Sequence, residues 1–129
     1  MIYVDSSVLL AELFGEDQKP SETLWDEQLT SSRLSEYEVW TRLHALDVGE
    51  RYEIEAARLL GGVSLLDMTP RVLGRALEPF PVALRTLDAL HVASIEHLRA
   101  ERVGVSLATF DRRMTDAARA MDIPLWEGL

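Results

Sequence analysis

Short apolar runs alternate with helical segments along the chain, and no other feature of the sequence limits its possible folds as strongly. The runs predicted to be strands are Met1–Val4, Thr30–Leu34, Val63–Met68, Val103–Leu107 and Ile123–Trp126. Among them, Thr30–Leu34 is expected at a sheet edge and Val63–Met68 in the interior. Strands joined by helices pair in parallel through right-handed crossovers, with helices on both faces of the sheet. We therefore expect the α/β class: a three-layer α/β/α sandwich around a mainly parallel sheet of about four to five strands.

The helices between these runs are marked by their apolar spacing and by the residues at their ends. Ser6–Phe14 has helical spacing and stops at Gly15, and a helix from Glu50 to Leu60 ends at a pair of glycines. The other helices are expected at Ser21–Leu29, Ser35–Leu46, from Thr69-Pro70 onward, Leu84–Arg99 and Arg112–Met121. No repeat or linker interrupts the pattern, so residues 1–129 are expected to form a single domain.

Composition narrows the classes of function. The chain contains no cysteine, which excludes disulfide scaffolds, cysteine zinc sites and thiol nucleophiles and suits a reducing compartment. Its N-terminus lacks the basic segment of a signal peptide, and no apolar run approaches the ~20 residues that span a bilayer. We expect a cytoplasmic protein with no membrane partner.

The charge of the chain is strongly and unevenly acidic. The net charge is −9, and residues 1–60 hold 13 acidic against 5 basic side chains. Because Lys and Arg drive binding to phosphate backbones by releasing counterions, such a chain is a poor general binder of nucleic acid. If nucleic acid is the substrate, we expect a local contact, helped by a metal ion and by the arginines of the second half.

Two acidic residues follow predicted strands. Asp5 comes immediately after Met1–Val4, and Asp111 comes shortly after Val103–Leu107. The working groups of open α/β sheets gather at the carboxyl ends of strands, so these carboxylates are candidates for a common site. Each also precedes a helix, where an Asp N-cap contributes ~1 kcal/mol, and this purely structural role stays open for both.

A third acid lies in an unusually apolar helix. In the segment LDALHVASI the only polar side chains are Asp88, His91 and Ser94, so this helix is expected to be buried. A buried carboxylate is costly unless it is paired or binds a metal, which makes Asp88 a candidate ligand. The structural alternatives are stabilisation of a first turn capped by Thr86, or a hydrogen bond to His91. His91 itself is expected to be a hydrogen-bonded core residue rather than a general base.

A fourth acid, Glu38, has a weaker pattern, because Ser35 and Glu38 have the spacing of a helix capping box. Oxygen-only ligands suit Mg²⁺ or Mn²⁺ rather than Zn²⁺. Several carboxylates in one place repel one another unless a cation lies between them. Such a site hydrolyses phosphodiesters by orienting water and lowering its pKa, but the spacing alone does not establish that the four acids meet.

Four segments resemble the motifs of the PIN-domain family. They are IYVDSSVLL, SSRLSEYEVWTRL, LRTLDALHVASI and SLATFDRRMTDAARAMDIPLW, in the family's order and over almost the whole chain. Within this family the chain is similar to the VapC-type toxins of toxin–antitoxin pairs. The resemblance implies a Mg²⁺- or Mn²⁺-dependent endoribonuclease that acts on RNA, usually forms a homodimer and is silenced by a cognate antitoxin.

The same resemblance implies roles for individual residues. The implied catalytic and metal-binding quartet is Asp5, Glu38, Asp88 and Asp111, with Glu38 either a ligand or the group that orients water. Supporting hydroxyls are implied at Thr109 and Ser6. Some members carry a further acid two or three residues after the fourth Asp, where this chain has Arg113 and Met114. Asp116 is then either a substitute or ordinary surface, and whether the site holds one metal or two stays open.

Several other residues have both a functional and a structural interpretation. Arg112 and Arg113 lie at the start of the last predicted helix, where they are either RNA-phosphate contacts or plain surface charge. Trp25, Tyr37 and Trp40 are expected in the core, and if exposed they would form an apolar groove suited to an antitoxin helix.

Two alternative functions remain open and a third is set aside. A phosphatase or receiver domain would need a lysine near a late strand, but the only lysine is Lys19, and Ser7 stands where such proteins carry a second acid. The open alternatives are a housekeeping RNA-processing nuclease and a non-catalytic interaction module on the same fold.

Overall fold

Four parallel strands form the central sheet, in the order β3-β2-β1-β4. In the computed structural model, which describes all of residues 1–129, the strands are β1 (Ile2–Val4), β2 (Leu29–Ser32), β3 (Ser64–Leu66) and β4 (Ser106–Ala108). The chain adds β2 and β3 on one side of β1 and then returns to the other side as β4. The direction in which the sheet grows therefore reverses between β1 and β4, and ligands of open α/β sheets bind beyond the carboxyl ends of the strands at such a point.

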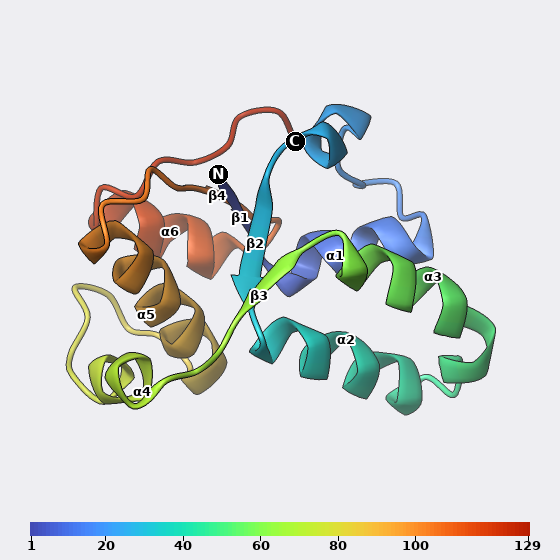
Figure 1. Cartoon of the computed structure of the whole chain (residues 1–129), viewed down its shortest axis with the longest axis horizontal. Coiled ribbons are helices and arrows are strands. Elements are labelled where there is room, and N and C mark those ends of the chain that lie inside the picture. The colour runs from blue at the N-terminus through green and yellow to red at the C-terminus, as the bar shows by residue number, and fades with distance from the viewer.

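Helices cover both faces of this sheet, as Figure 1 shows. On one side lie α1 (Ser6–Phe14), α2 (Leu34–Ala45) and α3 (Gly49–Gly61). On the other side lie α4 (Pro70–Ala76), α5 (Thr86–Ala100) and α6 (Arg112–Ala120). The expected three-layer α/β/α sandwich is confirmed.

Each face of the sheet has its own apolar core, and β1 contributes to both. Ile2 and Val4 pack with side chains of α1, α2 and α3, whereas Tyr3 packs with side chains of α5 and α6. Side chains alternate between the two faces of a strand, which explains this division. Because both faces are covered, the hydroxyl of the fully buried Tyr3 has to find its partners inside the protein.

The positions of β2 and β3 correct two sequence-based expectations. The strand expected at the edge, Thr30–Leu34, corresponds to β2 and lies inside the sheet, while the run Val63–Met68 supplies β3 at the edge. Two polar residues of β2 can be buried because their hydroxyls bond to neighbouring strands. Thr30 donates to the Ser64 carbonyl at 2.9 Å and Ser31 donates to the Val4 carbonyl at 2.7 Å. A hydroxyl that is satisfied in this way costs little to bury, so polarity does not mark an edge here.

Two other segments are less regular than the sequence indicated. The helix expected at Ser21–Leu29 is only a short 3-10 helix, Glu22–Asp26, because the chain enters β2 directly afterwards. The strand expected at Ile123–Trp126 contributes a single bridge to β4, at Leu125. No helix combines the length and apolarity that a membrane crossing requires.

Candidate functional site

Asp5 lies at the carboxyl end of β1, at the point where the sheet reverses its growth. Its backbone N–H donates to the carbonyl of Ala108 at 3.0 Å, so the pairing of β1 with β4 continues up to this residue. Only 5% of Asp5 is exposed. Although it precedes α1, its carboxylate makes no capping hydrogen bond with the helix, so helix capping does not account for this buried charge.

Two hydroxyls instead hold one oxygen of the Asp5 carboxylate. Ser7 donates to Asp5 Oδ2 at 2.8 Å and Thr109 donates to the same oxygen at 2.9 Å. Backbone amides fix both hydroxyls in turn, since Ser7 accepts from Phe110 N–H and Thr109 accepts from Asp111 N–H. The arrangement leaves Asp5 Oδ1 without a hydrogen-bonding hydroxyl.

The second hydroxyl of this cluster belongs to Ser7, whereas the family resemblance implies Ser6. No hydrogen bond joins the side chain of Ser6 to the Asp5 carboxylate. Ser7 is placed two residues beyond Asp5, in the first turn of α1, from where its hydroxyl reaches back to the carboxylate.

Asp88 lies in the first turn of α5, where the negative charges of two other acids act on it. Its pKa is raised by burial first, and then by the negative charges of Asp111 and Asp5. The positive charges of His91 and Arg113 act in the opposite direction. The structure thus places Asp88 where the charges of two of the other predicted acids, Asp111 and Asp5, act on it. The helix cap is Arg85 rather than Thr86, and its side chain makes no capping bond.

Asp111 has the capping role that the sequence left open. It is the N-cap of α6, and its Oδ1 accepts the backbone N–H of Arg113 at 2.9 Å. This bond leaves Oδ2 available for another partner. The cap also fixes the direction of the side chain at the carboxyl end of β4, next to Thr109.

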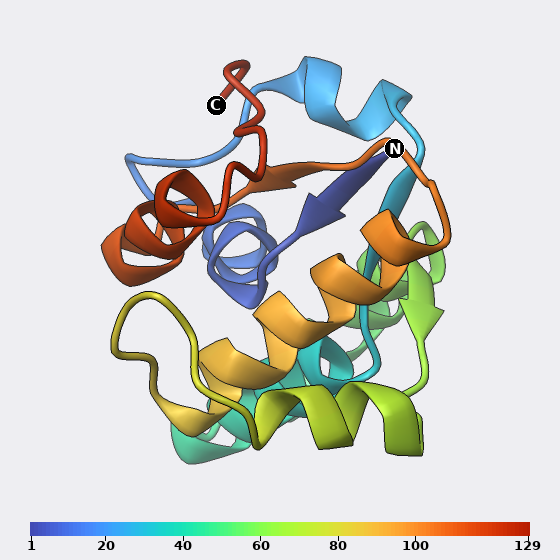
Figure 2. The same cartoon turned by 90° about the vertical axis from the view of Figure 1, so that its left-hand side faces the viewer.

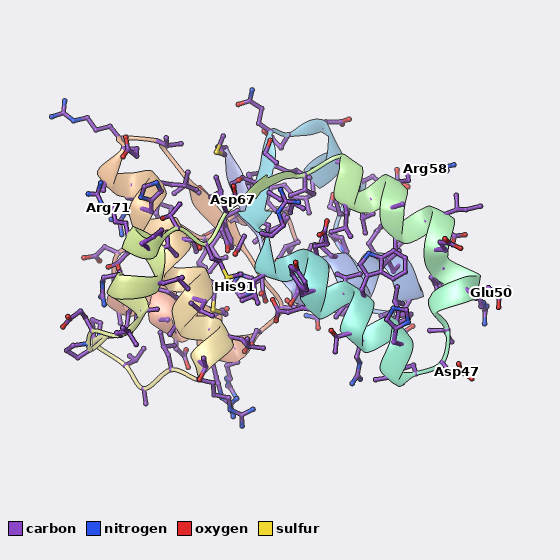
Figure 3. The ribbon with its side chains drawn as sticks, turned by 60° about the horizontal axis from the view of Figure 1, so that its bottom comes forward. Asp47, Glu50, Arg58, Asp67, Arg71 and His91 are labelled. Carbon is purple, nitrogen blue, oxygen red and sulfur yellow. The ribbon has the colours of Figure 1, made fainter.

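Glu38 approaches the cluster from α2, on the opposite side of the sheet from α5, and meets His91. The His91 Nε2 atom is 2.5 Å from Glu38 Oε1 and 3.9 Å from Asp5 Oδ1. Figure 3 shows His91 in the interior, between the ribbons of α5 and α2, far from the labelled Asp47 and Glu50 at the outer end of the α2–α3 pair. Burial lowers the pKa of His91, but the hydrogen bond with Glu38 and the negative charge of Asp5 outweigh it, and the net shift is upward.

The capping box expected from Ser35 and Glu38 is not formed. Helix α2 begins one residue earlier, at Leu34, so Ser35 is inside the helix and fully buried. Its hydroxyl lies 2.6 Å from that of Ser31. Glu38 is therefore free of the helix terminus and turns to His91 instead.

The remaining predicted residues lie around the cluster. Arg112 and Arg113 are exposed at the start of α6, and Arg113 is close enough to act on the charge of Asp88. Asp116 is exposed one turn further along the same helix, outside the hydrogen bonds of the cluster. The loop that leads into α5 and the start of α6 lie on the same side of the molecule (Figure 2).

The aromatic residues considered for an antitoxin groove do not lie together. Trp25 lines a hollow of about 380 Å³ with Leu29 and Leu59, and Trp40 lines a separate hollow of about 440 Å³. Tyr37 is 60% exposed on α2 and lines neither of them.

The donors of the cluster fit a hard divalent cation in chemistry, because they are carboxylate and hydroxyl oxygens. As the side chains stand, no three acidic or histidine groups are close enough together to hold an ion. The repulsion of Asp88 by Asp111 and Asp5 is what a cation would relieve.

Sequence reasoning missed two residues of this cluster, Tyr3 and Ser7. Tyr3 bonds to His91 Nδ1 at 2.7 Å and Ser7 bonds to Asp5. A tyrosine within a strand that is covered on both faces is a signal that could have been used, because its hydroxyl needs an internal partner.

Comparisons with known proteins agree with this architecture. The PIN domain family matches residues 2–120. Ribonuclease VapC46 of Mycobacterium tuberculosis strain H37Rv is 36% identical over 126 residues, covering 93% of this chain and 92% of that protein. Ribonuclease VapC47 of M. tuberculosis strain CDC 1551 is 30% identical over 131 residues, covering 92% and 90%.

A solved structure has the same fold. A chain of a toxin–antitoxin complex from Klebsiella pneumoniae superposes with a TM-score of 0.64 at 14% identity, covering 93% of this chain and 94% of that one. The family model and the two relatives establish that the chain belongs to the PIN-domain family.

Proposed function

We propose that this chain is a divalent-metal-dependent endoribonuclease that hydrolyses RNA phosphodiester bonds, and that it is the toxin of a VapBC-type toxin–antitoxin pair. One observation supports the chemistry above all: Asp5, Asp88 and Asp111 share one electrostatic neighbourhood at the point where the sheet reverses its growth. The two curated relatives, both named as VapC ribonucleases, support RNA as the substrate.

In this proposal the three aspartates hold Mg²⁺ or Mn²⁺. Such an ion, when bound, lowers the pKa of a water molecule and neutralises charge that develops on the phosphate. Thr109 and Ser7 keep one Asp5 oxygen fixed, so the other is directed to the ion. Glu38 orients the attacking water, since one of its oxygens is already taken by His91. Arg113 contributes positive charge for an RNA phosphate beside Asp88.

The test is cleavage of RNA by the purified chain. We expect cleavage with Mg²⁺ or Mn²⁺, none with EDTA, and recovery when excess Mn²⁺ is returned. Asp5→Asn should abolish cleavage and leave the circular dichroism spectrum unchanged, because the amide oxygen can still accept from Ser7 and Thr109. Cleavage by Asp5→Asn at the wild-type rate would refute the assignment of the metal site.

A cognate antitoxin is the proposed regulatory partner. Its support is that both relatives are named VapC and that the structural neighbour is a chain of a toxin–antitoxin complex. A small, basic, DNA-binding reading frame next to the gene is expected, and its product should copurify with this chain and inhibit cleavage. RNA cleavage without such a neighbour would favour the housekeeping nuclease, and binding without cleavage would favour the non-catalytic module.

A homodimer is also proposed. Leu77 after α4 is 88% exposed, and Leu73 on α4 and Leu87 on α5 are 43% and 47% exposed. These leucines are exposed on or beside two helices that pack on each other, and we propose that a second copy of the chain covers them. Light scattering at micromolar concentration should give a dimer for the wild type and a smaller mass for Leu77→Glu. A monomeric wild type would refute this part of the proposal.

A further inference from the structure

A buried chain of hydrogen bonds connects the backbone of β2 to Glu38 through two side chains from other elements. We propose that His91 is a positioning residue: with Tyr3 it forms a Tyr3–His91–Glu38 relay that holds the Glu38 carboxylate for its work at the acidic site. This inference rests on the proposed function for its catalytic consequence, but the relay itself can be tested without RNA or metal.

The relay starts from an atom that cannot move freely. The backbone N–H of Ser32 donates to the Tyr3 hydroxyl at 3.1 Å, and that hydroxyl lies 2.7 Å from His91 Nδ1. His91 Nε2 then lies 2.5 Å from Glu38 Oε1. Tyr3 is fully buried and His91 is 1% exposed, so no water competes for the bond between them.

The donor in each bond of the relay can be assigned from the Ser32 N–H, with which the relay begins. A backbone N–H can only donate, so the Tyr3 oxygen accepts from Ser32 and keeps its own proton for another partner. The nearby serine hydroxyls do not compete as donors. Ser31 donates to the Val4 carbonyl and Ser94 donates to the Leu90 carbonyl. When His91 is neutral, the Tyr3 proton goes to Nδ1, which lies 2.7 Å away and is a better acceptor than a hydroxyl oxygen.

With Nδ1 accepting, a neutral His91 must carry its proton on Nε2 and donate it to Glu38. A charged His91 carries a proton on both nitrogens, so its Nδ1–H donates to the Tyr3 oxygen and the Tyr3–His91 bond reverses direction, while its Nε2–H still donates to Glu38. The contact with Glu38 is therefore kept in either state. The other tautomer, with a bare Nε2 facing a carboxylate, is the arrangement that Tyr3 disfavours.

This contact explains how a glutamate from α2 can act precisely at a site built mainly on β1, β4 and α5. Glu38 is partly exposed, with 20% of its side chain accessible, and its long side chain would otherwise adopt several rotamers. His91 fixes one carboxylate oxygen and leaves the other for water. A catalytic group that is misplaced by about 1 Å can lose about 100-fold in rate.

The first experiment measures the relay directly in the metal-free, full-length protein. Nitrogen-15 NMR of the imidazole should show a proton on His91 Nε2 in the wild type. In Tyr3→Phe, where the Nδ1 partner is lost, a fraction of the other tautomer should appear. A wild-type His91 with an unprotonated Nε2 overturns the proposal, whether or not the chain cleaves RNA.

The second experiment separates positioning from a purely structural role. His91→Leu should lower kcat by about 10–100-fold with KM and Mn²⁺ affinity, measured by calorimetry, close to wild type. His91→Gln, whose amide N–H can reach the place of Nε2–H, should restore much of kcat, and His91→Asn should not. Equal losses in His91→Gln and His91→Leu, or a parallel loss of Mn²⁺ binding, would overturn the positioning role.

His97→Leu is the matched control, because His97 is on the same helix and its Nδ1 makes no hydrogen bond. It should keep the wild-type kcat. A double-mutant cycle completes the test: His91→Leu should have little further effect in a Glu38→Gln background, since both changes disable the same group. Fully additive losses would overturn the relay. If the wild type does not cleave RNA, the proposed function fails, and the NMR result still decides the relay.

Discussion

Thr109 donates a hydrogen bond of 2.9 Å to Asp5 across the boundary between β4 and β1, and joins two residues that are 104 positions apart in the sequence. The same hydroxyl accepts the backbone N–H of Asp111 at 2.9 Å. One threonine therefore sets the positions of two acids from different strands. This connection is available only because the two strands are neighbours in the sheet.

Thr109→Val tests the importance of both hydrogen bonds, because valine has nearly the shape of threonine but neither donates nor accepts. It leaves one Asp5 bond unmade and the Asp111 N–H without its acceptor, which should cost about 1–3 kcal/mol in the free energy of unfolding. Cleavage should fall by about 10–100-fold. Urea unfolding and single-turnover kinetics measure the two losses.

Thr115→Val is the control for that substitution. The Thr115 hydroxyl donates only to the Asp111 carbonyl, which also accepts the Thr115 backbone N–H. Stability and cleavage should stay close to wild type. Equal losses in both valine variants would mean that the Thr109 contact with Asp5 has no special importance.

Asp88→Asn should stabilise the metal-free protein. The pKa of Asp88 is raised in the folded state by burial and by Asp111 and Asp5. The folded protein thus holds this proton to higher pH than the unfolded chain does, and it loses stability as the pH rises through the ordinary carboxyl range towards the raised value. In EDTA at neutral pH, the Tm of Asp88→Asn should be a few degrees above that of the wild type.

Two further measurements check the same prediction. The difference in Tm should shrink when the pH falls below the ordinary carboxyl range, where Asp88 is neutral in both states. Added Mn²⁺ should raise the Tm of the wild type more than that of Asp88→Asn, because the ion stabilises the folded state that binds it. A lower Tm for Asp88→Asn in EDTA would argue against charge repulsion at this site.

The fold was predictable from the sequence because each strand and helix carries a local pattern. The helix Ser6–Phe14 and the apolar β1 followed from spacing alone, and the structure has them within one residue. The inner position of β2 was not predictable, because the hydroxyl bonds that bury Thr30 and Ser31 depend on neighbouring strands. Hydrogen bonds between strands that are distant in the sequence cannot be predicted from a short window of adjacent residues.

The candidate site was predictable only in part, for the same reason. Asp5 and Asp111 follow strands, which is a local signal. The contact between His91 and Glu38 joins residues 53 positions apart on two helices. The local capping-box pattern predicted instead that Glu38 would bond at the start of its own helix. Tyr3 was missed because its partner His91 comes from α5. Ser7 was missed because its hydroxyl is held at Asp5 by the backbone N–H of Phe110, from the segment after β4.

Ser35→Asp distinguishes the capping-box interpretation from the observed packing. At an N-cap, Asp replaces Ser at little cost. At the buried position that Ser35 occupies, an added carboxylate loses its hydration and faces the Ser31 hydroxyl, so the folded state should be destabilised by several kcal/mol. Urea unfolding of Ser35→Asp and Ser35→Ala measures this. A fully stable Ser35→Asp would support the cap.

Arg113→Gln should weaken RNA binding more than the chemical step. Arg113 is exposed at the start of α6, beside Asp88, where a phosphate next to the acidic cluster would meet it. KM for RNA should rise while kcat changes little, and the slope of log affinity against log salt should fall by about 1, the value expected for one lost phosphate contact. Arg119→Gln removes the same charge from the last turn of α6, far from Asp88, and should leave both quantities near wild type. If the two variants behave alike, Arg113 acts only through net charge and not through a local phosphate contact.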